Sequence, residues 1–325
     1  MFAPVNCSET STVTTDCYVV RLHGVLPCSS MVDHTWPLNR PIDLRRTLRF
    51  ALPHGPGLLF GGDLECSYAL STEAGPATVT VSAEEGSLVA TAVGRGAQLA
   101  IDAVPRTVGL DDNPDEFLSG KGLLRDQHQA HRGLRLGSSG RVFDTLLPAV
   151  IGQRVTTSEA KSSYRRLVAA TGEPAPGDLG LRLPPRPEVL ANMSYVDLHP
   201  FGIERNRAQL VIEVARRAGR LEQIIAMTRE DAERRLAAVR GVGPWTIAQV
   251  MGAAWGDRDA VPTGDLHLPN TVAWALAKEP RASDKRMLEL LEPFRPLRRR
   301  AITLIKLSGI HAPRYGPRSP KSAIN

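Results

Sequence analysis

The sequence contains few cysteines, only 4 among 325 residues, and all of them lie before residue 67. They are Cys7, Cys17, Cys28 and Cys66, and no two of them have the Cys-x-x-Cys spacing of common metal and redox motifs. We therefore expect neither a disulfide framework nor a cysteine-bound metal, and reduced thiols in a cytoplasmic protein are the simplest interpretation.

The sequence also lacks a hydrophobic run long enough to span a membrane, and its first residues show neither the basic nor the apolar part of a signal peptide. We therefore expect no membrane partner. Lys and Arg number 40 against 34 Asp and Glu, which gives a net charge of +6 and a pI of about 9.4. This excess is compatible with a polyanionic partner but does not require one.

Hydrophobic patterning predicts an α+β protein, because Val- and Thr-rich runs precede a long helical part. A helix is expected at 42–50, and an antiparallel sheet is expected from short strands at 57–60, 66–70, 77–82 and 87–93. A further short strand is an option at 17–22. The expected divisions are a loosely ordered segment (1–33), an α/β domain (34–112), a helical domain (113–312) that contains a helical hairpin (230–256), and a basic tail (313–325).

Beyond residue 141 the spacing of apolar residues is helical almost to the end of the chain. Helices are expected at 143–155, 158–171, 186–191, 206–218, 221–227, 230–239, 245–256, 270–277, 285–291 and 298–307. The pair His128 and His131 precedes them, but no third metal ligand lies nearby. A solvated loop or helix face is therefore the preferred interpretation of these histidines.

Two of these helices flank a glycine-rich reversal. Thr228 and Asp231 fit the start of the first helix, where a threonine side chain caps the backbone. Gly241 and Gly243 permit a sharp turn, and Pro244 suits the first turn of the second helix. Backbone amides at such a turn point outward and can hold an anion. The expected anion is a phosphate of a nucleic-acid backbone.

Asp265 follows 22 residues after Gly243, in a loop that contains Pro262 and Gly264. An isolated aspartate before a helix is usually an N-cap, and Pro269 predicts a helix start just beyond it. The spacing from the hairpin, enough for one helix and a return loop, favours a second role. A carboxylate beside a bound DNA backbone can stabilise positive charge on a deoxyribose.

The run Leu-x-x-Val-Arg-Gly-Val-Gly-Pro-Trp-Thr, followed by Val-Pro-Thr-Gly-Asp, resembles the helix-hairpin-helix (HhH-GPD) DNA glycosylase superfamily. Within it the sequence is most similar to the bacterial 3-methyladenine DNA glycosylase II branch. Supporting blocks begin at Phe143 (Phe-Asp-Thr-Leu-Leu-Pro-Ala-Val-Ile-Gly-Gln-Arg-Val), Gly202 (Gly-Ile-Glu-Arg-Asn-Arg-Ala) and Phe294 (Phe-Arg-Pro-Leu-Arg-Arg-Arg-Ala). The resemblance covers residues 140–310, and 34–112 fits the family's N-terminal domain only weakly.

This resemblance implies a base excision repair enzyme in the bacterial cytoplasm, associated with the nucleoid, whose partner is duplex DNA that contains a damaged base. The base leaves the stack before a pocket reaches its glycosidic bond. Ionised Asp265 is then the catalytic residue, which stabilises an oxocarbenium-like sugar and activates a water. Trp245 occupies the position of the lysine in bifunctional relatives, which implies a monofunctional enzyme that leaves an abasic site. A monomer is expected. The DNA-contacting residues implied are Gly241, Val242, Gly243, Thr246, Gln153, Arg154 and Arg298.

The resemblance implies no organic cofactor and no metal other than a monovalent cation at the hairpin carbonyls. The absence of cysteines after Asp265 excludes the usual iron–sulfur cluster of related branches. The pocket positions implied are Trp245, Gln249, Leu266 and Lys306, of which Trp245 fits a pocket wall and a core position equally well. Enzymes that excise alkylated bases are expected to carry aromatics there, since rings bind electron-poor cationic bases.

These departures leave the substrate open. An alkylated purine such as 3-methyladenine is the family's expectation, whereas Lys306 in the pocket would repel a cationic base and favour a neutral deaminated or oxidised one. Lys306 pointing outward to a phosphate is an equal alternative, and Lys306 as a nucleophile is a remoter one. A different class also remains: a hairpin protein that binds damaged or bent DNA without excising a base.

Overall fold

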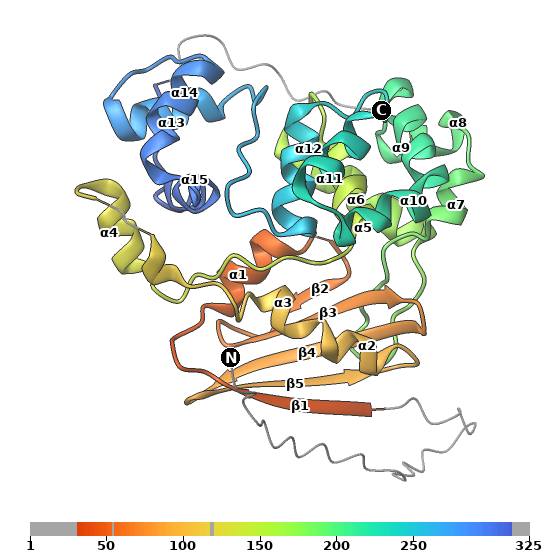
Figure 1. The fold of residues 1–325 in the computed structure, drawn as a ribbon. Helices are drawn as coiled ribbons and strands as arrows, with labels where there is room; N and C mark the ends of the chain where they lie inside the picture. Colours follow the sequence, from red (N-terminus) through yellow and green to blue (C-terminus); the bar gives the residue numbers. More distant parts are fainter. Residues whose placement is uncertain (1–30, 54, 118–119, 314–325) are drawn as a thin grey trace, which may run out of the picture.

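The computed structural model describes residues 31–53, 55–117 and 120–313. The expected strand at 17–22 and nearly all of the expected terminal segments lie outside this range. A sheet occupies one side of the molecule, and two groups of helices lie above it (Figure 1). The predicted α+β fold class is confirmed. The expected domain boundaries stay predictions.

The sheet has five antiparallel strands in the order β1-β5-β4-β3-β2. Their bounds are Met31–Pro37 (β1), Leu58–Phe60 (β2), Glu65–Thr72 (β3), Gly75–Glu84 (β4) and Ser87–Val93 (β5). A two-residue turn joins β4 to β5, with Glu84 opposite Ser87, and Gly86 adopts the positive φ of 72° that such a turn requires. Strand β1 was not expected, because Met31–Pro37 alternates exposed and half-buried positions and lacks an apolar run.

Three helices cover the sheet: α1 (Leu44–Ala51), α2 (Ala97–Asp102) and α3 (Val104–Val108). Helices α2 and α3 lie along one face of the sheet (Figure 1), where they close a core of strand residues and alanines. Helix α1 was expected from its pattern. Helices α2 and α3 are each shorter than two turns, so their sequences contain too little periodicity to predict them.

Twelve α-helices of the described part follow the sheet domain: α4 (Leu123–Ala130), α5 (Val142–Ile151), α6 (Thr157–Thr171), α7 (Pro187–Ala191), α8 (Tyr195–Leu198), α9 (Arg205–Arg216), α10 (Ala218–Glu222), α11 (Arg229–Ala237), α12 (Pro244–Val250), α13 (Leu268–Ala277), α14 (Asp284–Leu291) and α15 (Arg298–Leu307). Short 3-10 turns occur at Pro114–Glu116, His199–Phe201, Gln223–Ala226 and Glu292–Phe294, and one π-helical turn occurs at Met251–Trp255. The expected helices are present, most with shifted ends, except that the one expected at 221–227 is largely the 3-10 turn Gln223–Ala226 after α10. Helices α4 and α8 were not expected.

The helices form two groups with separate cores. One core surrounds the buried helix α5 and extends through α6, α9, α11 and α12. The other joins α13, α14 and α15 with Leu124 of α4. The two groups stand apart in Figure 1, and the segment after α12 runs from the first group to α13 of the second. This segment carries Asp265.

Helix α15 is also anchored to the end of the sheet domain. The guanidinium of the fully buried Arg300 pairs with the carboxylate of Asp112, which accepts a further hydrogen bond from the Leu136 amide at 2.9 Å. A buried pair of this kind fixes a position, since removing either partner leaves a desolvated charge. The C-terminal group of helices is therefore held against the N-terminal part of the chain.

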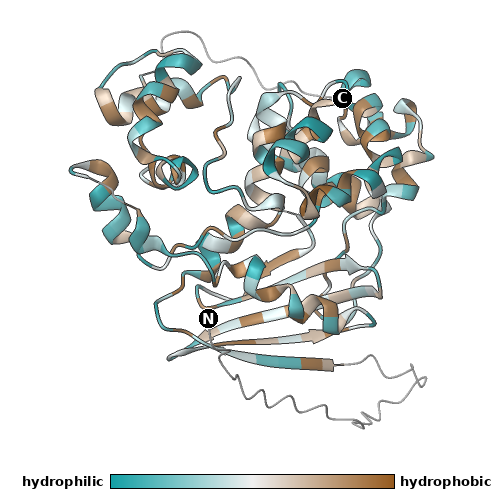
Figure 2. Ribbon diagram, viewed as in Figure 1, coloured by the Kyte–Doolittle hydropathy of each residue, from teal (hydrophilic) through white to brown (hydrophobic). Residues whose placement is uncertain are grey.

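Within residues 31–53, 55–117 and 120–313, no helix combines the length and the apolar character needed to cross a membrane. The helices carry hydrophilic as well as hydrophobic residues along their lengths (Figure 2).

Candidate active site

The turn between α11 and α12 presents unpaired backbone amides. Gly241 adopts a positive φ of 97°, and the Val242 amide closes the turn by donating to the Val239 carbonyl at 3.0 Å. In the described part of the chain no acceptor is found for the amides of Gly241, Gly243 or Trp245. These amides lie at the N-terminus of α12, where the helix dipole also favours an anion.

Gly243 is not required by the geometry of the chain. Its φ of −92° and ψ of 179° are open to any residue, and a Cβ atom added there would meet no atom within 4 Å. Gly241 differs, since a Cβ there would lie 3.1 Å from Leu210 and its φ is positive. The open space above Gly243 therefore suits the close approach of an external group.

The end of α5 is fastened to this turn by Gln153. Its Nε2 atom donates to the Gly241 carbonyl and lies 3.0 Å from both that oxygen and the Thr246 Oγ1 atom. Thr246 is 2% exposed, so its hydroxyl supports the turn from inside. The next residue, Arg154, is exposed and has a φ of 59°, which is strained for a residue with a side chain. Helix α5 ends at Ile151 and not at 155 because the chain leaves the helical conformation here.

Asp265 is held by three hydrogen bonds. Its Oδ1 atom accepts from the amides of His267 and Leu268, both at 2.8 Å, and its Oδ2 atom accepts from the indole nitrogen of Trp245 at 3.0 Å. The carboxylate therefore caps the start of α13, as an aspartate at this position was expected to do, and also contacts the first turn of α12. Charge-assisted hydrogen bonds of this kind fix the orientation of a carboxylate.

A second carboxylate supports the loop of Asp265. The Oδ2 atom of Asp284, at the start of α14, accepts from the Gly264 amide at 2.9 Å. The other oxygen, Oδ1, is buried and has no hydrogen-bond partner among the described residues. Gly264 adopts a φ of 81°, and its bond to Asp284 fixes the residue directly before Asp265. Nothing in the sequence marked Asp284, because it reads as an ordinary first-turn aspartate.

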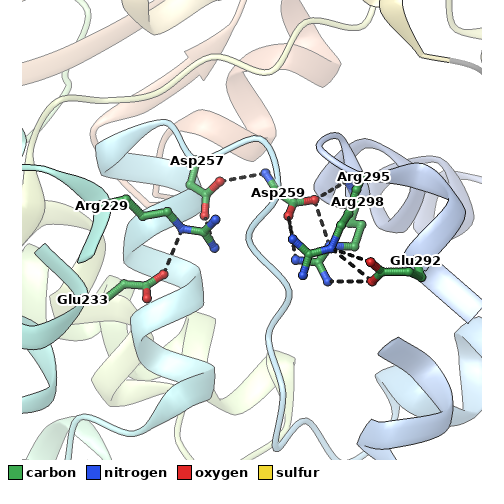
Figure 3. Close-up of polar contacts among 7 residues, drawn as sticks. All are labelled: Arg229, Glu233, Asp257, Asp259, Glu292, Arg295 and Arg298. Atoms are coloured by element: carbon green, nitrogen blue, oxygen red, sulfur yellow. Dashed lines mark hydrogen bonds and ion pairs between the residues drawn. The ribbon is translucent and has the colours of Figure 1, made fainter. Parts of the chain in front are cut away.

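The connecting segment is fixed from both sides by the ionic contacts in Figure 3. Asp257 pairs with Arg229 of α11 at 3.1 Å, and its Oδ1 atom accepts from the Asp259 amide at 2.8 Å. Asp259 accepts two hydrogen bonds from one edge of the Arg298 guanidinium on α15, from Nε at 2.8 Å and from Nη2 at 2.6 Å. Burial alone would raise the pKa of Asp259, but the hydrogen bonds and charge of Arg298, together with Arg295, hold it below its ordinary value.

Arg298 therefore lies inside the molecule. It is 6% exposed, and its guanidinium is engaged by Asp259, so the structure gives it a supporting position and not the surface position of a DNA contact. The Asp-Arg-Asp sequence at 257–259 and the arginines at 295–300 were the available signals for this network. They did not identify which charges pair.

The other expected pocket residues are distributed around Asp265. Trp245 and Gln249 are half-buried on α12, one turn apart. Leu266 is 81% exposed. Lys306 is exposed near the end of α15, and the carboxylate of Asp265 is among the charges that act on it. The structure thus brings together Asp265, Trp245 and the hairpin, with Lys306 on the opposite helix group.

Residues 147–296 match the family model described as HhH-GPD superfamily base excision DNA repair protein. The chain is 26% identical over 172 residues to the putative DNA-3-methyladenine glycosylase YfjP of Bacillus subtilis, covering 52% of this chain and 59% of that protein. It therefore spans about three fifths of that relative's length.

Two solved structures share the fold. The 3-methyladenine DNA glycosylase of Archaeoglobus fulgidus superposes with a TM-score of 0.72 at 21% identity, covering 84% of this chain and 97% of that one. The 8-oxoguanine glycosylase/lyase of Clostridium acetobutylicum, in complex with duplex DNA, superposes with a TM-score of 0.66 at 16% identity, covering 87% and 97%. Residues 147–296 are thus similar in sequence to the HhH-GPD superfamily of base excision DNA repair proteins, and the two solved structures show the same fold over most of the chain.

Proposed function

We propose that the chain is a monofunctional DNA glycosylase that flips a damaged base out of duplex DNA and hydrolyses its N-glycosidic bond. The observation that carries this proposal is the position of Asp265. An oriented carboxylate lies beside a helix N-terminus with unpaired amides, at a loop fixed by Asp284. The similarity to proteins of Bacillus subtilis and Archaeoglobus fulgidus that are named as 3-methyladenine DNA glycosylases supports the proposal.

The proposed binding step uses the hairpin. The amides of Gly241, Gly243 and Trp245 hold a phosphate of the lesion strand, with the dipole of α12 behind them. Such contacts position the duplex and carry no sequence information. Arg154 is exposed next to the hairpin and has a strained backbone. Its side chain fills the space that the flipped nucleotide leaves.

The proposed chemical step uses Asp265. As the bond between C1′ and the base nitrogen breaks, the sugar acquires positive charge, which the Asp265 carboxylate stabilises. A water adds its oxygen to C1′, and its proton is released as the base departs. Trp245 offers no amine at the start of α12, so the product is an intact strand with an abasic site.

The test is a panel of duplexes, each with one alkylated, deaminated or oxidised base, incubated with the wild type and with Asp265→Asn. We expect alkali-dependent strand cleavage at one or more lesions, lowered by at least about a hundredfold in the variant, with duplex binding retained. Binding of damaged DNA without excision of any lesion would reject the proposal. That result would favour a protein that binds damaged DNA without excising a base. The presence of Gln249, Leu266 and Lys306 at positions where aromatic residues are expected supports this alternative.

A further inference from the structure

One side of α15 carries two cationic residues that face the other group of helices. Arg299 and Lys306 are seven residues apart, about two helical turns, and so lie on the same side. The Nε atom of Arg299 lies 2.9 Å from where a Cβ of Gly252 would be, and its Nη2 atom donates to the Phe50 carbonyl at 3.4 Å. Since Gly252 belongs to the turn after α12, this side of α15 faces α12.

Arg299 closes the inner end of this side and Lys306 lies at its outer end. The Nη1 atom of Arg299 is buried without a hydrogen-bond partner among the described residues. The pKa of this guanidinium is lowered to about 10, chiefly by burial; Asp257 and Asp112 oppose the change, and Arg300 adds to it. The end of this side at Arg299 is therefore closely packed, and the end at Lys306 is the accessible one.

The ammonium of Lys306 is not neutralised by a bound partner. Within residues 31–53, 55–117 and 120–313 it has no hydrogen bond or ion pair, although Asp265 acts on it electrostatically. The three hydrogen bonds of the Asp265 carboxylate go to His267, Leu268 and Trp245 instead. Lys306 is thus an unpaired cation within electrostatic range of the carboxylate that the proposed reaction uses.

Lys306 is open to solvent and is also flanked by protein. Its side chain is exposed to solvent, yet desolvation by the surrounding protein lowers its pKa, with Arg299 adding to this effect and Asp265 opposing it. Such a side chain is accessible to a ligand and still partly desolvated. Charges in such a position act more strongly than on a convex surface.

We propose that Lys306 selects the class of lesion, favouring neutral bases with carbonyl groups over cationic N-alkylated purines. This inference rests on the proposed glycosylase function and names its substrate class. A neutral base departs with the electron pair of the C1′–N bond and gains negative charge, which an ammonium stabilises until a proton is taken up. A cationic base departs as a neutral molecule, so the ammonium only repels it before the reaction.

Two further residues of the candidate site, Gln249 and Leu266, agree with this choice. Gln249, half-buried on α12, offers an amide that can hydrogen-bond a carbonyl or ring nitrogen of a neutral base. The exposed Leu266 provides an apolar contact but no aromatic ring on which a cationic base could stack. Neither residue compensates for the repulsion between Lys306 and a cationic base.

The experiment compares single-turnover excision rates for two neutral bases, hypoxanthine and 8-oxoguanine, and two cationic ones, 7-methylguanine and 3-methyladenine, in one duplex sequence. The variants are Lys306→Met, which keeps the length and removes the charge, and Lys306→Arg, which keeps the charge. Lys285→Met, at an exposed position of α14, is the matched control for the change in net charge. Thermal melting of each variant checks folding.

We expect the wild type to excise at least one neutral base faster than either cationic base. Lys306→Met should lower the neutral-to-cationic rate ratio by at least about tenfold, whereas Lys306→Arg and Lys285→Met should keep it. The inference is overturned if the wild type prefers cationic bases, or if Lys306→Met leaves the rate ratio unchanged. In either case the excision itself still supports the proposed function. A wild type that excises no lesion rejects both.

Discussion

The indole nitrogen of Trp245 donates a hydrogen bond of 3.0 Å to the Oδ2 atom of Asp265. This bond joins the first turn of α12, whose amides are proposed to hold the DNA phosphate, to the carboxylate proposed to act on the sugar. It makes Trp245 a positioning residue, because the bond fixes which oxygen of Asp265 faces the hairpin.

Replacing Trp245 with Phe keeps an aromatic side chain and removes the donor. Since a hydrogen bond to a charged group contributes about 1.5–3 kcal/mol, excision should slow by roughly ten- to a hundredfold, with little change in duplex affinity. Single-turnover rates and fluorescence anisotropy of a lesion duplex measure the two effects separately. Equal rates in wild type and Trp245→Phe would show that the bond does not orient the carboxylate.

Gly243→Ala should weaken binding to every duplex by a similar factor, on the order of tenfold, because the added methyl group occupies the space that a phosphate needs. The chain itself tolerates the change, since the backbone there is extended and no atom lies within 4 Å of the new Cβ. The melting temperature should therefore stay within about 2 °C of the wild type.

The matched control is Gly219→Ala, an exposed glycine of α10 with equally open space. It should leave binding unchanged. A Gly243→Ala variant that binds like wild type, or that loses affinity for one lesion only, would argue against a phosphate site at the hairpin.

Asp284→Ala removes the acceptor of the Gly264 amide without touching Asp265 itself. The loop before Asp265 then loses a fixed point, and excision should fall by roughly tenfold while thermal stability changes little, since the contact lies near the surface. Asp284→Asn, which can still accept from Gly264, should restore most of the rate. A failure of Asn to exceed Ala would assign Asp284 no positioning role.

Asp259→Asn should lower the free energy of unfolding by about 3–5 kcal/mol at pH 7, since it leaves the buried guanidinium of Arg298 with only the exposed Glu292, 3.9 Å away, as a counter-charge. The folded-state pKa of Asp259 is below its ordinary value of 3.8, so its stabilising contribution is complete above that value and is lost as the pH falls toward the folded pKa.

Urea unfolding of wild type and Asp259→Asn between pH 3 and 7 measures this effect. The difference between the two proteins should be constant near neutrality and should shrink below about pH 4. A difference that grows on acidification would contradict the assigned sign.

The elements that the sequence predicts well are those whose pattern is local. The strands at β3, β4 and β5 and the helices of the hairpin were expected because their apolar spacing or turn residues suffice. Asp265 was expected near the hairpin because its separation from Gly243 allows only one helix between them. Its hydrogen bonds to His267 and Leu268 follow the usual capping pattern, whereas the bond from Trp245 required the fold.

Contacts between distant segments were not predictable. Arg298 was expected at the DNA surface, yet the fold brings it to Asp259, 39 positions earlier in the chain. Asp284 and Arg299 carry no local signal, because one resembles a helix start and the other is one arginine in a run of three. The position of Lys306 depends on which side of α15 faces α12. The contact between Arg299 and Gly252 shows that side in the structure, and no local sequence pattern indicates it.

The clamp formed by Asp257 and Asp259 has a consequence for how damage would be found. Because the segment between the helix groups is tied to α11 on one side and to α15 on the other, the protein has little freedom to open around a duplex. The distortion must then be borne by the nucleic acid, which costs several kcal/mol and least where pairing is already weak. The protein would thus select sites first by how easily the DNA deforms, before it contacts any atom of the damaged base.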